Sequence, residues 1–154
     1  MFWKLPPKIK IYEALGSLAD ERVEPLEGGA KVYSSSRKKF YTVTYDKEKH
    51  AIMANDNGSF WQGYLGYPAI AYLMQIGEIE YDKKVSEVLK GIEWKEVNTK
   101  FKNNYDKTIE YVHALAEEKG VKSNLIEMEV DKTLMWIESH PLKMLGKRIE
   151  PPKE

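Results

Sequence analysis

The sequence predicts a single α+β domain over residues 1–154. We expect an N-terminal helix, then an antiparallel meander of three to four strands, then about four helices packed on one face of the sheet. Two observations predict this class. Helical and strand-like segments are grouped along the chain rather than alternating, as they are in α+β folds. The connections between the strands are also too short to allow parallel pairing.

The N-terminal half supplies the first helix and the meander. Pro6 and Pro7 precede apolar residues at helical spacing, which predicts a helix from about Pro7 to Ala19. A short strand is expected around Val23, before the turn at Gly28. β-branched and aromatic residues then predict three further strands, namely AKVYSS (30–35), KFYTVTYD (39–46) and HAIMAN (50–55).

The C-terminal half reads as helical. A proline at its start and a glycine after its end bound a nearly all-apolar helix at 68–76. Asp82 caps a short helix that ends before Gly91. An amphipathic stripe predicts a long helix over 93–119, which Asn103-Asn104 kinks or splits. Residues 124–139 fit either a helix or a strand plus a helix; the helix is preferred because of a capping box. The tail after Gly146 is expected to fray.

Composition excludes several classes of function. The formal net charge is zero, so no global field draws the chain to nucleic acid or an anionic membrane. There are no cysteines, which excludes disulfides, thiolate catalysis and cysteine-ligated metals. The absence of an apolar run of spanning or signal-peptide length predicts a cytoplasmic protein without membrane association. Enrichment in Lys and Glu predicts a thermophilic source.

The loop NDNGSFWQGYLGYP, residues 55–68, mixes aromatic residues with turn-forming ones. In the structural interpretation, which we prefer, its aromatic residues plug the junction between the sheet and the helix. In the alternative, the loop binds a small molecule. Trp61, Tyr64 and Tyr67 would then line a partly open concavity, with Asn55 or Asn57 supplying polar groups. A neutral or aromatic ligand would be favoured, because Asp56 is the only formal charge of the loop.

The second candidate site is the basic stretch 34–39. Arg37, Lys38 and Lys39 lie among aromatic residues, a mixture that single-stranded nucleic-acid platforms use. The preferred interpretation is a soluble hairpin tip, because a nucleic-acid surface carries a wider basic footprint. We therefore expect no nucleic-acid partner.

No catalytic, cofactor or metal signature is present. Glu110, His113 and Glu117 share a helix face, but a di-iron site needs its Glu-x-x-His motif twice, and the chain has it once. We expect these residues to face solvent and predict neither a metal nor a cofactor. Asn98 falls within the apolar stripe of its helix and needs a hydrogen-bonding partner if it is buried.

The leading functional hypothesis is a non-catalytic protein-interaction module that forms a homo-oligomer. It rests on the lack of catalytic motifs and on more amphipathic helix than one small sheet can cover. A small-molecule site in loop 55–68, in a binding protein or an enzyme, is the alternative, and nucleic-acid binding through hairpin 34–39 is the second.

Overall fold

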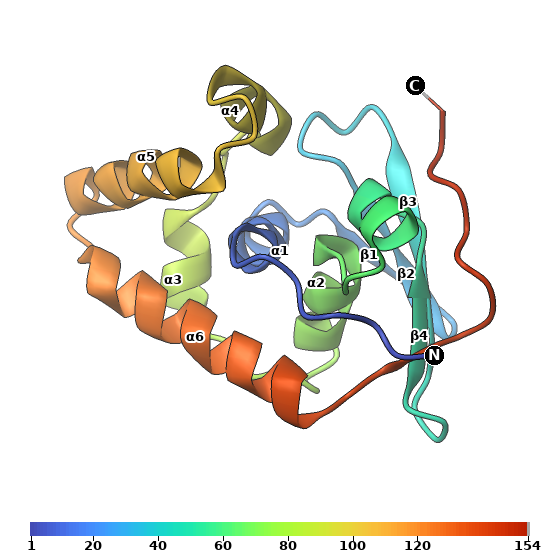
Figure 1. Cartoon of the computed structure of the whole chain (residues 1–154). Helices are drawn as coiled ribbons and strands as arrows, with labels where there is room; N and C mark the ends of the chain where they lie inside the picture. Colours follow the sequence, from blue (N-terminus) through green and yellow to red (C-terminus); the bar gives the residue numbers. More distant parts are fainter. Residues whose placement is uncertain (154) are drawn as a thin grey trace.

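The computed structural model describes residues 1–153. A mostly antiparallel sheet lies on one side and the helices on the other (Figure 1). In chain order the elements are α1 (Ile9–Ala19), β1 (Val23–Leu26), β2 (Gly29–Tyr33), β3 (Phe40–Asp46), β4 (Ala51–Ala54), the π-helical turn η1 (Gly58–Gln62), α2 (Tyr67–Gln75), α3 (Lys83–Val88), α4 (Trp94–Lys100), α5 (Tyr105–Glu118), α6 (Ser123–Ser139) and β5 (Lys143–Met144). The predicted α+β class and its order of elements are confirmed.

The sheet has the order β1-β2-β3-β4-β5. The first four strands form the predicted antiparallel meander. Side chains alternate along β3, where Tyr41 and Val43 are buried while Phe40, Thr42 and Thr44 face solvent. The period of two expected for a half-buried strand is therefore present.

The core lies between the sheet and the helices. The central helix α2 is buried from Pro68 to Met74, because its sequence has no polar face. Helix α1 packs against both α2 and α3, and its residues Ile9, Ile11 and Leu15 are inaccessible to solvent. Among the described residues, no helix has the length and apolar character needed to cross a membrane.

The C-terminal half refines several predictions. The amphipathic stretch 93–119 splits into α4 and α5, because Lys102 and Asn103 adopt positive φ angles. Residues 124–139 lie within one helix, α6, which confirms the preferred alternative. Within residues 1–153, the meander is followed by five α-helices rather than about four, partly because of this split.

The segment after α6 was not predicted to join the sheet. Lys143 and Met144 form β5, which pairs in parallel with β4. From there the chain runs back beside the sheet toward the β2–β3 hairpin (Figure 1), where Lys153 lines a cavity. Residues 148–153 form no helix or strand and are mostly exposed, so the fraying of this tail stays a prediction.

Candidate ligand-binding site

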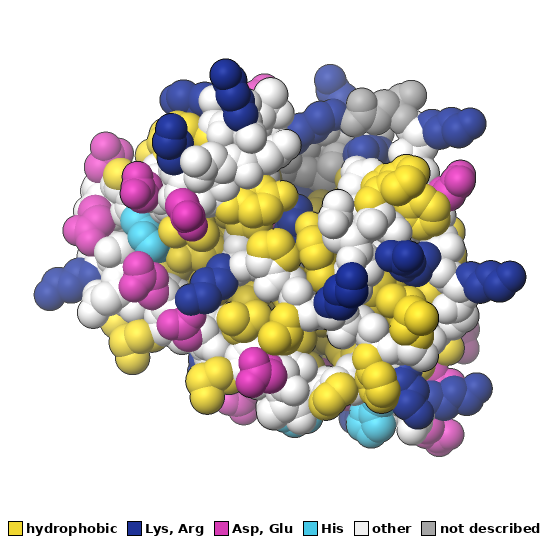
Figure 2. All heavy atoms as spheres, in the orientation of Figure 1, with side chains coloured by type: hydrophobic (Ala, Val, Ile, Leu, Met, Phe, Trp, Pro, Cys, Tyr) yellow, Lys and Arg dark blue, Asp and Glu magenta, His cyan; other side chains and the backbone are white. Residues whose placement is uncertain are grey.

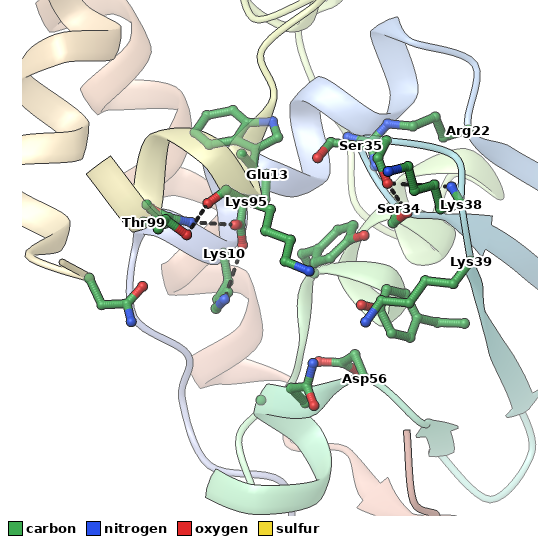
Figure 3. Close-up of a pocket in the computed structure, with 18 of the residues that line it drawn as sticks. Lys10, Glu13, Arg22, Ser34, Ser35, Lys38, Lys39, Asp56, Lys95 and Thr99 are labelled. Atoms are coloured by element: carbon green, nitrogen blue, oxygen red, sulfur yellow. Dashed lines mark hydrogen bonds and ion pairs between the residues drawn. The ribbon is translucent and has the colours of Figure 1, made fainter. Parts of the chain in front are cut away.

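A cavity of about 660 Å³ lies between the sheet and the helical half. Its lining comes from many parts of the chain: α1, Arg22 before β1, the β2–β3 hairpin with Tyr41 of β3, the start of η1, the start of α2, α4 with the turn after it, the start of α5, and Lys153. Figure 3 shows Lys10, Glu13, Lys95 and Thr99 on one side, facing Arg22, Ser34, Lys38 and Lys39 on the other, with Asp56 below them. This is the volume of a typical small-molecule site.

The lining is strongly basic for a chain of zero net charge. Among the described residues, two acidic side chains line the cavity, Glu13 and Asp56, whereas the basic ones are Lys10, Arg22, Lys38, Lys39, Lys95 and Lys153. Lys and Arg side chains also gather over the β2–β3 hairpin on the surface (Figure 2). Basic side chains therefore outnumber acidic ones in the described lining of the cavity, which favours a negatively charged occupant.

Arg22 is the most unusual of these cations. It sits between α1 and β1 and is 1% exposed. Its Nη1 donates to the carbonyl of Tyr33 at 2.7 Å, and its Nε donates to Asp20 Oδ2 at 3.2 Å. Its Nη2 is buried without any hydrogen-bond partner. An unpaired donor on a buried cation costs stability, so a partner from outside the chain is expected to satisfy it.

On the opposite wall, Glu13 and Asn98 form a buried pair. Asn98 Nδ2 donates to Glu13 Oε1 at 3.0 Å, which is the partner that the sequence required for a buried Asn98. Lys10 Nζ lies 3.2 Å from Glu13 Oε2 as an ion pair. Asn98 Oδ1 is buried and receives no hydrogen bond. Glu13 Oε2 has the Lys10 ammonium as its ion-pair partner, and a carboxylate oxygen, with two lone pairs, can accept a further hydrogen bond.

Lys10 is charged despite its burial. Burial lowers the pKa of Lys10, but the Glu13 carboxylate, together with nearby tyrosines, outweighs this effect and the pKa is raised. The ammonium group therefore offsets the negative charge of Glu13 on this side of the cavity.

Aromatic rings lie between the two walls. Tyr41 and Tyr67 meet edge to face with centroids 6.1 Å apart, and the Arg22 guanidinium lies 5.9 Å from the Tyr67 ring. Burial raises the pKa of Tyr41 to about 12 and also raises the pKa of Tyr67. Both hydroxyl groups thus stay protonated at neutral pH and add no negative charge.

Asp56 closes the base of the cavity. Its carboxylate is buried and accepts hydrogen bonds from Ser59 Oγ at 2.6 Å and from Ser59 N at 3.2 Å. Burial raises the pKa of Asp56, although the bonds from Ser59 oppose the shift. Gly66 packs directly on this carboxylate, and a Cβ at that position would collide with it.

The structure brings part of predicted loop 55–68 to the cavity. Asn57 and Tyr67 line it. Asn55 instead accepts a hydrogen bond from Thr42 N at 2.8 Å, which anchors the end of β4 to β3. Tyr64 packs against Gly58, and Trp61 is 68% exposed beside Phe60. Trp61 therefore neither lines the cavity nor plugs the core.

The basic hairpin 34–39 also divides. Lys38 and Lys39 line the cavity. Arg37, at a positive φ of 63°, turns away and donates to the carbonyl of Asp20. The two candidate sites that the sequence suggested separately thus share one cavity.

The sequence did not predict that Lys10, Glu13 and Arg22 belong to the site. Lys10 and Glu13 belong to a helix that was recognised only by its apolar face. The one available signal was the polar Asn98 within an apolar stripe.

Glu110, His113 and Glu117 of α5, which were expected to face solvent, do so with one exception. Glu110 and Glu117 are exposed, but His113 is partly buried, with Nε2 2.8 Å from the Tyr12 hydroxyl. Within residues 1–153, no group of three or more histidine or acidic side chains is placed to hold a metal ion.

Comparison with known proteins gives one match. No curated protein and no solved structure is significantly similar to this sequence. A family model described as "Uncharacterised conserved protein UCP014422" matches residues 3–143. That span includes both walls of the cavity and leaves out Lys153. The chain therefore belongs to the family of uncharacterised conserved protein UCP014422.

Proposed function

We propose that this protein binds a small organic anion in the cavity between the β2–β3 hairpin and the α1–α4 wall. The observation that carries the proposal is the buried guanidinium of Arg22, whose Nη2 has no partner. Arginine offers planar paired donors that suit phosphate and carboxylate groups. Lys38, on the neighbouring hairpin, adds a second positive charge on the same side (Figure 3).

The sequence alone favoured a neutral ligand, because loop 55–68 carries one formal charge. The cations of the cavity come from other segments. Their proximity changes the expected ligand from neutral to anionic, while the small-molecule class stays the same.

Isothermal titration calorimetry with ribose 5-phosphate, and with ribose as the neutral control, tests the proposal. We expect binding of the phosphate ester alone, weakening as salt rises because ions screen the attraction. If ribose 5-phosphate, pyrophosphate and citrate all fail to bind at low salt, the proposal is wrong.

Matched lysine variants localise the binding. Lys38→Ala removes a cation from the cavity, whereas Lys49→Ala removes an exposed lysine from the β3–β4 hairpin at the other end of the sheet. We expect Lys38→Ala to weaken binding about tenfold, equivalent to about 1.4 kcal/mol. Lys49→Ala should leave the affinity unchanged. Equal losses in both variants would point to nonspecific charge attraction.

Self-association is a second proposed function, and it rests on α6. Leu125, Met128 and Met135 follow one another at helical spacing and are 51%, 65% and 71% exposed. Apolar side chains are visible along this helix in Figure 2. Exposed apolar residues in one stripe are typical of interaction faces.

Sedimentation velocity over a range of concentrations tests this second proposal. We expect wild-type protein to form dimers or larger species, and Met128→Glu with Met135→Glu to sediment as monomer. The control Lys132→Glu changes charge on the same helix without removing apolar surface. A wild-type monomer at tens of micromolar would contradict self-association. Nucleic-acid binding through hairpin 34–39 stays the second alternative from the sequence alone, and no nucleic-acid partner is expected.

A further inference from the structure

The wall opposite Arg22 constrains the other end of the ligand. Glu13 and Asn98 are 5% and 9% exposed; Asn98 Oδ1 has no hydrogen-bond partner, and Glu13 Oε2 is paired with the Lys10 ammonium but can accept a further hydrogen bond. Trp94 Nε1 also has no hydrogen-bond partner, but it packs against Gly16 of α1 and so does not face a ligand in the cavity. The open groups of this wall that a ligand can use are therefore acceptors.

The orientation of Asn98 follows from its neighbour. A carboxylate can only accept hydrogen bonds, so the amide must turn its NH₂ group toward Glu13. That contact, at 3.0 Å, fixes Oδ1 as the remaining open atom of Asn98. The wall thus presents two acceptor oxygens, Glu13 Oε2 and Asn98 Oδ1, and a ligand that binds to them must carry N–H or O–H donors.

The donors that fit here are neutral. Lys10 already pairs with Glu13 at 3.2 Å, and its raised pKa keeps it protonated. A ligand ammonium group would meet this charge at close range and be repelled. An aromatic amine or amide N–H carries no charge and satisfies both oxygens without that cost.

The space between the two ends is lined by flat rings. Tyr41 and Tyr67 lie between the walls, and Tyr105 adds a third ring to the lining. Side chains of this kind stack on the bases of nucleotides. The volume of about 660 Å³ accommodates a ligand of nucleotide size.

We propose that the ligand is a nucleoside phosphate whose base carries an exocyclic amine, with the phosphate at Arg22 and Lys38 and the amine at Glu13 and Asn98. This inference rests on the proposed function and adds the identity of the ligand class. It assigns a separate part of the ligand to each wall, so the two ends can be tested independently.

The test is calorimetry with two matched pairs of nucleotides. GMP carries an exocyclic amine that IMP lacks, and CMP has an amine where UMP has a carbonyl oxygen. We expect the amine-bearing member of at least one pair to bind about tenfold more tightly than its partner, because the lost donor leaves a buried acceptor unpaired. Ribose 5-phosphate serves as the phosphate end alone.

Two variants on α4 sharpen the test. Asn98→Ala removes the open oxygen and should abolish the preference for the amine while leaving the affinity for ribose 5-phosphate unchanged. Glu96→Ala is the matched control, because Glu96 lies on the same helix, is exposed and does not line the cavity. Circular dichroism verifies that both variants are folded; if Asn98→Ala is not, Asn98→Ser replaces it.

The outcomes separate the two proposals. If ribose 5-phosphate binds and both nucleotide pairs bind without preference, anion binding stands and the nucleotide inference is overturned. If none of the phosphate compounds binds, anion binding itself fails. A preference that persists in Asn98→Ala would also overturn the assigned position of the amine.

Discussion

The two hairpin ends of the sheet both carry basic residues but have different surroundings. The β2–β3 hairpin carries Arg37, Lys38 and Lys39, and the β3–β4 hairpin carries Lys47 and Lys49. The first lies opposite α1 and α4 and lines the cavity, whereas the second projects from the other end of the molecule (Figure 1).

Their charges are also balanced differently. Lys47 lies 3.3 Å from Glu78, and Lys49 lies 4.0 Å from Asp46, so acidic neighbours accompany both lysines. Basic side chains predominate over the first hairpin, while both signs mix around the second (Figure 2). The comparison teaches that the surroundings of a run of lysines, and not the run itself, motivate the binding role proposed for the β2–β3 hairpin. A buried arginine and a second wall distinguish the β2–β3 end.

The largest expected effect comes from removing the buried cation beneath the first hairpin. Arg22→Ala deletes the bonds to Tyr33 and Asp20. We expect a loss of about 3 kcal/mol in the free energy of unfolding, as for breaking a buried ion pair. Urea denaturation measures it, with Lys49→Ala as the exposed control. A loss below about 1 kcal/mol would show that Arg22 contributes little to holding this end together.

The pH dependence of stability provides the second prediction. Because burial raises the pKa of Asp56 in the folded state, ionising it costs folding free energy. The stability of the wild type relative to Asp56→Asn should therefore fall as pH rises from about 3.8, the unfolded value, through the raised folded pKa. Thermal unfolding from pH 3 to 8 measures the difference. A difference that stays constant over this range would contradict the burial of an ionisable carboxyl group.

Hydrogen exchange compares the hairpins within a single sample. A bound phosphate ester should slow amide exchange severalfold at residues 34–39, because it ties the hairpin to the cavity. Exchange at residues 46–50 should not change. Mass spectrometry with and without ribose 5-phosphate measures both segments, and equal protection of the two would remove the distinction drawn between them.

The smallest effect is expected within loop 55–68. Trp61 is 68% exposed, so Trp61→Ala should change the free energy of unfolding by no more than about 0.5 kcal/mol. Large aromatic truncations in a core cost about 3–5 kcal/mol. Chemical denaturation distinguishes these values. A loss of about 3–5 kcal/mol would indicate that Trp61 is buried at the junction between the sheet and the helix.

The fold was largely predictable because its signals are local. Alternation in 39–46 predicted β3, and a nearly all-apolar run bounded by a proline and a glycine predicted α2. β5 was missed because two residues, Lys143 and Met144, carry no periodicity. Its position depends on partners about 90 residues earlier in the chain.

The cavity was predictable only in pieces. Tyr67 and Lys38 were both candidates, but they were assigned to separate sites with separate ligands. Arg22 lies between two elements and matches no motif. Its burial results from packing among α1, β1 and β2, which no local pattern encodes.

The parallel pairing of β5 has a consequence for the order of events during synthesis. Lys143 N donates to the carbonyl of His50 and Met144 N to that of Met1, so one edge of the sheet is completed by residues synthesised about 90 residues after β4. Until then, the ribosome holds a nascent chain whose β4 edge exposes unpaired backbone groups. Open edges recruit other strands. This topology therefore exposes neighbouring nascent chains to association through their β4 edges. The exposure ends when Lys143 and Met144 pair with β4.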